Sequence, residues 1–220
     1  MSSGADEIIR LYERHAEAWD RNRMADLVLE RAWMERFVAL LPPGGTVLDL
    51  GCGSGQPMAR HLLERGFAVV GVDSSPTLIA KCRRRFPDAE WFVADMRALL
   101  IDRKFDGLIA WDSFFHLLHE DQKGMFAVFR AHASSGAPLL FTTGAVHGEA
   151  IGSFEGEPLY HASLAPEEYG TLLASHGFEM LDHAVEDPGC GGHTVWLAQY
   201  EHSGSNDPPH LTAPNAARGR

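Results

Sequence analysis

Cysteine is scarce in this chain: Cys52, Cys82 and Cys190 are the three among 220 residues. An odd number of widely spaced cysteines provides neither a disulfide framework nor a metal-binding spacing. Long apolar runs are also missing, since no stretch approaches the ~18 residues of a membrane span. The first residues, MSSGADEIIR, contain no apolar signal core. We therefore expect a cytoplasmic protein with no membrane partner.

Basic residues are outnumbered, with 19 lysines and arginines against 30 acids and a net charge of −11. This balance argues against a protein whose affinity depends on neutralising phosphates, so no nucleic-acid partner is expected. The short run Arg83–Arg85 fits the solvated end of a helix. Twelve histidines invite a metal hypothesis, and His116 and His119 are three residues apart. No carboxylate spacing completes a recognisable site, so we expect no metal.

Strands and helices alternate along most of the chain. Residues 6–41 have helical apolar spacing and form an N-terminal cap (1–41) that ends before Pro42. Seven strands are then expected, at 46–50, 67–72, 90–94, 105–110, 138–142, 178–185 and 193–200. Helices are expected after Pro57, at 76–86, at 121–133 and at 166–175. This order predicts an α/β fold: a doubly wound, mostly parallel sheet with helices on both faces.

The last two strands lie close together and predict one antiparallel strand at the end of the sheet. Residues 144–163 have little periodicity and are expected to be a long functional loop. Residues 1–202 are interpreted as a single domain, followed by a disordered tail at 203–220 that is rich in Ser, Gly, Pro and Asn.

The run VLDLGCGSG at 47–55 is a strand that ends in a loop with few side chains, where a ligand can lie against the backbone. A dinucleotide fingerprint needs G-x-G-x-x-G. Here Gly51, Gly53 and Gly55 place the third glycine one residue early, and Gln56 follows. Asp49 would repel a pyrophosphate and would suit a cation. The loop therefore favours a positively charged, nucleoside-like ligand.

Three successive strands end in aspartate: Asp49, Asp73 and Asp95. The carboxyl ends of strands form the ligand-binding edge of an open α/β sheet. Asp73 comes 18 residues after Gly55, close to the ~20-residue offset of an acid that binds ribose hydroxyls. Asp95 can accept from an exocyclic amine, and the N–H of Met96 can meet a ring nitrogen. The group predicts an adenosine site, although each aspartate alone would serve equally as a cap.

The motifs VLDLGCGSG, GVD at 71–73 and VADMR at 93–97 together resemble the class I S-adenosylmethionine-dependent methyltransferases, over roughly residues 30–200. The resemblance implies a Rossmann-like, seven-stranded sheet whose last strand is antiparallel, and an N-terminal helical lid. It also implies that the three loop glycines approach S-adenosylmethionine, whose sulfonium suits the acidic loop. The implied cofactor-binding residues are Asp49, Gly51, Gly53, Gly55, Asp73, Ser74, Asp95, Met96 and Trp111.

In this family the segment after the fourth strand commonly faces the methyl group. Asp112 is followed here by Ser113 and Phe114 rather than by Pro-Pro-Tyr or Pro-Pro-Phe, which speaks against methylases of nucleic-acid amines. His116 is the candidate base, because its unperturbed pKa of ~6.5 lies near working pH. Asp112 would orient a polar substrate, and Trp111 and Phe114 would wall the pocket. Helix capping and core packing are the alternatives for all four residues.

Four further residues are candidates for contact with the substrate. Tyr12 and Trp19 are seven residues apart and share one helical face, as in a lid with an aromatic residue over the cofactor; packing into the core is the alternative. Tyr160 and His161 lie in the expected loop, among acids and aromatics. They suggest a small, polar acceptor, for which an amine is one candidate.

The sequence thus predicts a cytoplasmic methyltransferase that moves a methyl group from S-adenosylmethionine to a small molecule by in-line displacement. The catalytic candidates are His116 and Asp112. The alternatives are a nucleic-acid or protein methyltransferase, or a non-catalytic S-adenosylmethionine-binding protein. The sequence leaves the oligomeric state open between monomer and homodimer.

Overall fold

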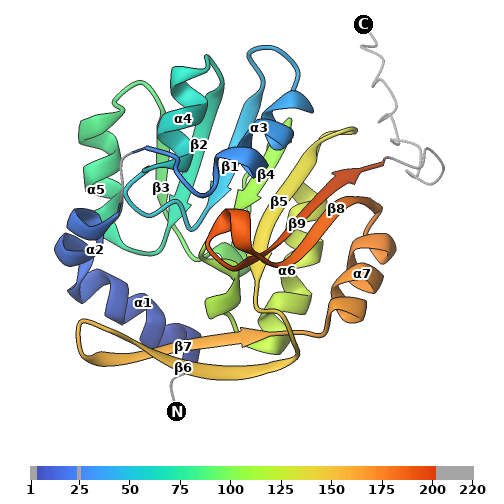
Figure 1. Cartoon of the computed structure of the whole chain (residues 1–220). Coiled ribbons are helices and arrows are strands. Elements are labelled where there is room, and N and C mark those ends of the chain that lie inside the picture. Colours follow the sequence, from blue (N-terminus) through green and yellow to red (C-terminus); the bar gives the residue numbers. More distant parts are fainter. Residues whose placement is uncertain (1–3, 24–25, 202–220) are drawn as a thin grey trace, which may run out of the picture.

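The computed structural model describes residues 4–23 and 26–201. Its centre is a seven-stranded sheet in the order β3-β2-β1-β4-β5-β9-β8 (Figure 1). The strands are β1 Thr46–Leu50, β2 Ala68–Asp73, β3 Glu90–Val93, β4 Gly107–Ala110, β5 Pro138–Thr143, β8 Phe178–Asp187 and β9 His193–Tyr200. Strand β9 pairs antiparallel with both neighbours, whereas the other pairings are parallel. The predicted fold class is confirmed.

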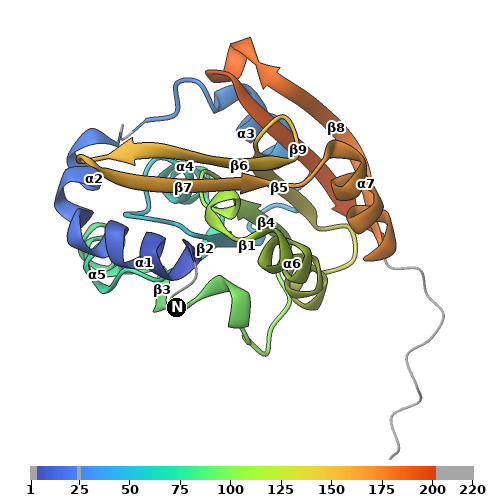
Figure 2. The same ribbon diagram turned by 90° about the horizontal axis from the view of Figure 1, so that it is seen from below.

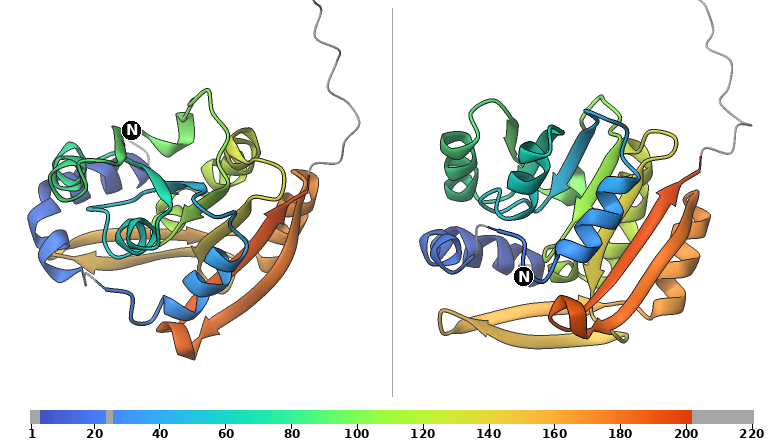
Figure 3. Two further views of the ribbon diagram at one scale, coloured as in Figure 1. Left: turned by 90° about the horizontal axis from the view of Figure 1, so that it is seen from above. Right: turned by 45° about the horizontal axis from the view of Figure 1, so that its top comes forward.

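Helices cover both faces of the sheet (Figure 3). The first face carries α3 Arg31–Ala39, α4 Met58–Glu64 and α5 Pro76–Arg85; the second carries α6 His119–His132 and α7 Pro166–Ser175. Alternation along each strand builds the two cores: Val47 packs into the first, while Leu48 and Leu50 pack into the second. The strands are apolar on both faces because helices cover both, and a buried core forms on each side of the sheet.

The N-terminal segment differs in detail from the helical stretch expected at 6–41. It forms three helices, α1 Gly4–Arg14, α2 Ala16–Asn22 and α3. The chain leaves helical geometry at His15, with φ −107° and ψ 20°. Helices α1 and α2 lie at the carboxyl ends of the parallel strands, next to α5, while α3 packs on the sheet (Figure 1). The apolar residues of this segment therefore pack against two different surfaces, and only tertiary contacts determine where the segment divides.

The expectation of a loop at 144–163 is wrong. This segment contains an antiparallel hairpin, β6 Gly148–Phe154 and β7 Glu157–Ser163, which runs beside α1 (Figure 2). Glu155 and Gly156 form its two-residue turn, and both have positive φ, 50° and 80°. The sequence shows no alternation because most of β6 is exposed on both faces.

Short 3-10 segments complete the edge of the sheet: η1 Met96–Ala98, η2 Phe114–His116 and η3 Pro188–Cys190. None of the helices in the described ranges is long and apolar enough to cross a membrane. The tail expected at 203–220 lies outside the described residues.

Candidate functional site

A cavity lies at the carboxyl ends of β1, β2, β3 and β4, beneath α1 and α2. Its lining includes ten of the residues that the sequence singled out: Tyr12, Trp19, Gly51, Gly53, Asp73, Ser74, Asp95, Met96, Asp112 and His116. The other lining residues are Ile8, Ile9, Val72, Leu78, Ala94, Arg97, Ser113 and Leu117. The fold therefore brings the N-terminal segment and four strand ends to one place.

The glycine loop is closely packed against its surroundings. Gly51 has φ +75°, and a Cβ there would lie 2.3 Å from Cβ of Ser113. A Cβ on Gly53 would lie 3.1 Å from Nε1 of Trp19, so the loop touches the N-terminal helices. Gly55 faces Phe86 and lines neither described cavity; its role here is packing. Two of the three glycines, Gly51 and Gly53, thus line the cavity, and at both a side chain would crowd neighbouring protein atoms.

Asp73 ties β2 to the glycine loop. Its carboxylate accepts hydrogen bonds from the N–H of Gly53 at 2.9 Å and of Ser75 at 2.8 Å. Burial raises the pKa of Asp73 above its usual value, while these backbone hydrogen bonds act in the opposite direction. The carboxylate is held at the cavity wall, and its contact with a ribose stays a prediction.

Asp49 lines a second, smaller cavity, which shares Trp19, Gly51, Gly53 and Asp112 with the first. Its side chain is 3% exposed, and burial, followed by the charge of Asp73, raises its pKa to about 7. Arg23 and Trp111 also line this cavity, and the buried Nε1 of Trp111 has no hydrogen-bond partner among the described residues. Asp112 lines the cavity as well, so two acids, one base and one available donor surround the same small space.

Asp95 stabilises the turn that follows β3. It accepts from the N–H of Arg97 at 2.9 Å and pairs with the guanidinium of that residue at 2.6 Å. The guanidinium also reaches Asp121, at 3.1 Å. Arg97 is not predicted as a site residue by the sequence, because only the fold places it against the cavity.

Asp112 follows β4 in a left-handed conformation, with φ 48°. Its Oδ2 lies 3.1 Å from Nη1 of Arg23, and its Oδ1 lies 2.9 Å from Nε2 of His193. Burial alone would raise the pKa of Asp112, but His193 and Arg23 lower it below the usual value. The sequence did not indicate either cation, since both come from segments remote in the chain.

His116 is held from both sides. Its Nε2 is 2.9 Å from the hydroxyl of Tyr12, and its Nδ1 is 2.8 Å from the carbonyl oxygen of Tyr160. A carbonyl only accepts, so we assign the ring proton to Nδ1, and Nε2 accepts from Tyr12. Burial lowers the pKa of His116 to about 4. The expectation of a base that titrates near working pH is therefore wrong: this imidazole is neutral and already hydrogen-bonded.

The remaining substrate candidates lie in different settings. Phe114 is wholly buried among Phe126, Phe129 and Phe141, so it is part of the core and does not wall the cavity. The hydroxyl of Tyr160 points to Glu149 on the hairpin, and only its carbonyl serves the site. The ring of His161 lies 4.8 Å from the ring of His116 and supports it.

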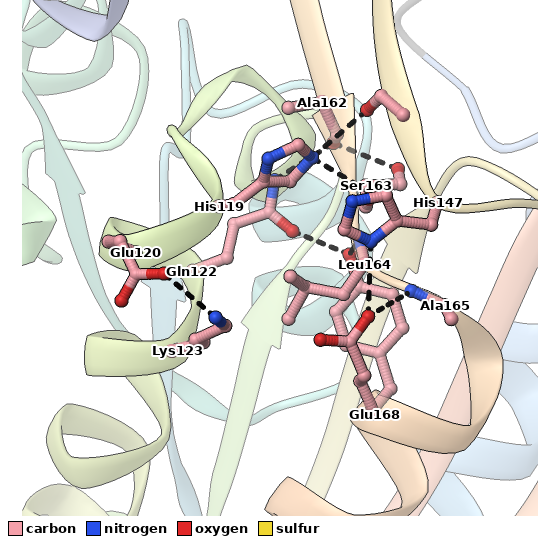
Figure 4. A network of polar contacts seen from close by, with 12 residues as sticks. His119, Glu120, Gln122, Lys123, His147, Ala162, Ser163, Leu164, Ala165 and Glu168 are labelled. Carbon is pink, nitrogen blue, oxygen red and sulfur yellow. Dashed lines mark hydrogen bonds and ion pairs between the residues drawn. The ribbon is translucent and has the colours of Figure 1, made fainter.

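His119 belongs to a separate polar network at the base of the hairpin (Figure 4). Its Nε2 lies 3.1 Å from the carbonyl oxygens of both Gly148 and Ser163, and its ring stacks on His147 at 4.6 Å. Within 4–23 and 26–201, no group of three or more His, Cys, Asp or Glu side chains is placed to hold a metal ion. His116 and His119 therefore belong to two different hydrogen-bond networks.

Hydrogen bonds and ion pairs fix the N-terminal helices to α5. Glu13 accepts from the hydroxyls of Ser75 and Thr77 at 2.5 and 2.7 Å, at the N-terminus of that helix. Asp20 pairs with Lys81 at 3.2 Å and with Arg85 at 2.6 Å. The basic run at 83–85, expected to be only solvated, thus contributes Arg85 to closing the cavity.

The hairpin holds the other side of the same helices. Glu157 pairs with Arg14 at 2.5 Å and with His15 at 2.6 Å. The ring of Phe154 lies 5.9 Å from Tyr12 and 6.0 Å from Trp19. Helices α1 and α2 and the hairpin together form a two-part cover, of which the sequence predicted only the helices.

Residues 47–136 match a family model described as "Methyltransferase domain". Among curated proteins, trans-aconitate 2-methyltransferase of Azoarcus sp. is 39% identical over 85 residues, or 36% of this chain and 33% of the relative. The dTDP-3-amino-3,4,6-trideoxy-alpha-D-glucopyranose N,N-dimethyltransferase of Streptomyces venezuelae is 30% identical over 127 residues, or 57% of this chain and 48% of the relative. The chain thus spans about half or less of these relatives.

Solved structures agree in fold. A glycopeptide N-methyltransferase in complex with S-adenosylhomocysteine has a TM-score of 0.64 at 19% identity, covering 81% of this chain and 91% of that one. The 1,6-didemethyltoxoflavin-N1-methyltransferase of Burkholderia thailandensis has a TM-score of 0.68 at 19% identity, covering 90% and 87%. The fold is that of the class I S-adenosylmethionine-dependent methyltransferases. The match over 47–136 shows that this part of the chain is similar to a methyltransferase domain.

Proposed function

We propose that this protein transfers a methyl group from S-adenosylmethionine to a small-molecule acceptor by in-line displacement. The observation that carries the proposal is the covered cavity, where the glycine loop, Asp73 and His116 converge. The bound cofactor supplies an electrophilic methyl on a sulfonium. The protein mainly has to align the two reactants and exclude water, and alignment alone is worth ~7–11 kcal/mol.

The residues fit such a cofactor. Gly51 has a positive φ and no side chain, so its backbone can lie directly against the ligand. Asp73 would accept from ribose hydroxyls, and Ser74, Asp95 and Met96 would surround the nucleoside. In the smaller cavity, Asp49 would pair with an ammonium, and the free Nε1 of Trp111 would meet a carboxylate oxygen beside Arg23, which is itself paired with Asp112 and Glu30. An α-amino acid end of the ligand carries both groups.

The acceptor side is formed by Tyr12 and His116. Because Tyr12 donates its proton to Nε2 of His116, the lone pairs of its oxygen remain available to an N–H or O–H of the acceptor. A neutral imidazole with a pKa of about 4 is a weak base, so the acceptor has to be nucleophilic when it binds. Several similar proteins are N-methyltransferases. We therefore favour an uncharged amine as acceptor.

Two measurements test the proposal. Calorimetry is expected to show binding of S-adenosylhomocysteine, weakened at least tenfold by Asp73→Ala and unchanged by Asp88→Ala at an exposed turn. Labelled methyl transfer from S-adenosylmethionine is expected with small amines and not with RNA or protein. Binding of NAD in place of S-adenosylhomocysteine would overturn the assignment of the cofactor, and labelling of RNA or protein would overturn the small-molecule acceptor.

The cellular setting belongs to the same proposal. Cys52, Cys82 and Cys190 are all buried free thiols, which agrees with a cytoplasmic location.

A further inference from the structure

His193 brings the far end of the sheet into contact with the site. It is the first residue of β9, and it follows the Gly191–Gly192 turn. Its Nε2 forms an ion pair with Oδ1 of Asp112 at 2.9 Å, and its Nδ1 lies 2.6 Å from the carbonyl oxygen of Cys190. His193 lines neither described cavity. It therefore acts on the site through the residues it contacts: Asp112, and Trp111, whose ring centroid lies 5.7 Å from that of His193.

The two partners of His193 determine its protonation state. Each ring nitrogen faces an oxygen that can only accept, so a neutral ring would place a nitrogen lone pair against one of them. The imidazolium suits both contacts, of which the one at Nε2 is an ion pair, since Oδ1 of Asp112 has no hydrogen-bond partner among the described residues. The close contact with Asp112 and its charge accordingly raise the pKa of His193 to about 8, against the opposing effect of burial.

Asp112 lies where several constraints meet. Its backbone is in the left-handed region, which costs a non-glycine residue energy and is common at functional sites. Its N–H donates to Oγ1 of Thr142 at 2.9 Å. Its second carboxylate oxygen binds Arg23, the residue that caps α2, and the guanidinium of Arg23 is also 3.6 Å from Glu30. The carboxylate thus connects the sheet to the end of the lid.

We propose that protonated His193 is a positioning residue: it fixes the carboxylate of Asp112 between the two cavities and, through it, holds Arg23 and the end of α2 in the ligand-binding arrangement. The inference rests on the proposed function, since it concerns ligand binding at that same site. When His193 loses its proton, Asp112 keeps only Arg23 as a cation. The end of α2 is then held less firmly, and ligand binding weakens as the pH rises past the pKa of the imidazolium.

The charged groups around His193 allow a selective test. They are Asp112 and Glu30, which favour the imidazolium, and Arg23, which is bound to both acids. Burial raises the pKa of the neighbouring Cys190 thiol to about 12, so that thiol remains neutral near pH 8. Titration of Asp49, the ligand's own amine and other groups affects wild type and variant alike. It cancels in a ratio of dissociation constants.

The variant is His193→Gln, whose amide N–H can still meet Asp112 but cannot titrate. The ratio of its Kd for S-adenosylhomocysteine to that of the wild type is expected to be roughly tenfold at about pH 7 and to approach one near about pH 9.5. His183→Gln, on the neighbouring strand β8, is the matched control, and its ratio is expected to stay near one. A ratio for His193→Gln that is constant over this range overturns the proposal and leaves the proposed function intact.

A ligand-free measurement separates the two proposals further. Proton NMR of the His193 ring is expected to show titration near pH 8 in the wild type and at a clearly lower pH in Asp112→Asn. An unchanged titration in Asp112→Asn overturns the positioning role, whatever the protein binds. If the wild type binds no S-adenosylhomocysteine at any pH, the proposed function fails, and the inference fails with it.

Discussion

The hydroxyl of Tyr12 lies 2.9 Å from Nε2 of His116, joining the first helix to the segment that follows the fourth strand. The contact holds the tyrosine oxygen at the cavity, because His116 is itself fixed by a hydrogen bond to the carbonyl oxygen of Tyr160. Two residues 104 positions apart thus act as one polar unit on the expected acceptor side.

Removal of this hydroxyl is expected to slow methyl transfer. Tyr12→Phe should lower kcat by about 10–100-fold with little change in affinity for the cofactor, because the ring remains and only the acceptor loses its hydrogen bond. Tyr160→Phe is the control, since its hydroxyl faces Glu149. Steady-state kinetics with labelled S-adenosylmethionine measure both. Equal turnover in Tyr12→Phe and wild type would remove Tyr12 from the acceptor site.

Burial of neutral His116 makes stability dependent on pH. The folded-state pKa is about 4 against ~6.5 unfolded, so the unfolded state binds more protons between these values. The free energy of unfolding should therefore fall as the pH drops from about 6.5 to 4, by roughly 3 kcal/mol from this residue. Urea unfolding at several pH values measures it, and His116→Gln should flatten the slope. A slope that His116→Gln leaves unaltered would contradict the burial argument.

Asp49→Asn is expected to separate stability from binding. The folded-state pKa of Asp49 is about 7 against ~3.8 unfolded, so its stabilising, protonated form is lost as the pH rises through 7. At about pH 8 the amide variant should be more stable, by up to roughly 4 kcal/mol. It should also bind S-adenosylhomocysteine less tightly, because the ammonium loses its partner. Thermal unfolding and calorimetry on the same samples test both. Tighter binding would show that Asp49 does not face the amine.

Gly51→Ala and Gly66→Ala form a matched pair. Both positions have positive φ, +75° and +83°, but a Cβ at Gly51 would clash with Ser113 and one at Gly66 would enter open space. Both variants should lose ~1–2 kcal/mol from backbone strain. Gly51→Ala should lose a further ~1–3 kcal/mol from overpacking, together with cofactor binding. Equal losses in denaturant unfolding would show that the loop relaxes around the added methyl.

The sequence by itself determined the sheet and the cofactor edge. Apolar strands must be covered on both faces, and parallel strands bring their carboxyl ends to one edge. The placing of Asp49, Asp73 and Asp95 therefore followed from counting strands. The glycine spacing had a direct steric meaning, because a backbone with positive φ beside Ser113 has no room for a side chain. These relations are local or follow from strand order, so one sequence suffices to predict them.

Only the tertiary structure decided what surrounds Asp112 and Tyr12. Arg23, Phe154 and His193 come from three segments that are far apart in the sequence, and no spacing in the chain predicts that they meet near Asp112 and Tyr12. Burial likewise changed His116 from the expected titrating base into a neutral hydrogen-bonding group, and it placed Phe114 in the core. Desolvation and long-range ion pairs depend on which surfaces the fold brings together, and that information is absent from local periodicity.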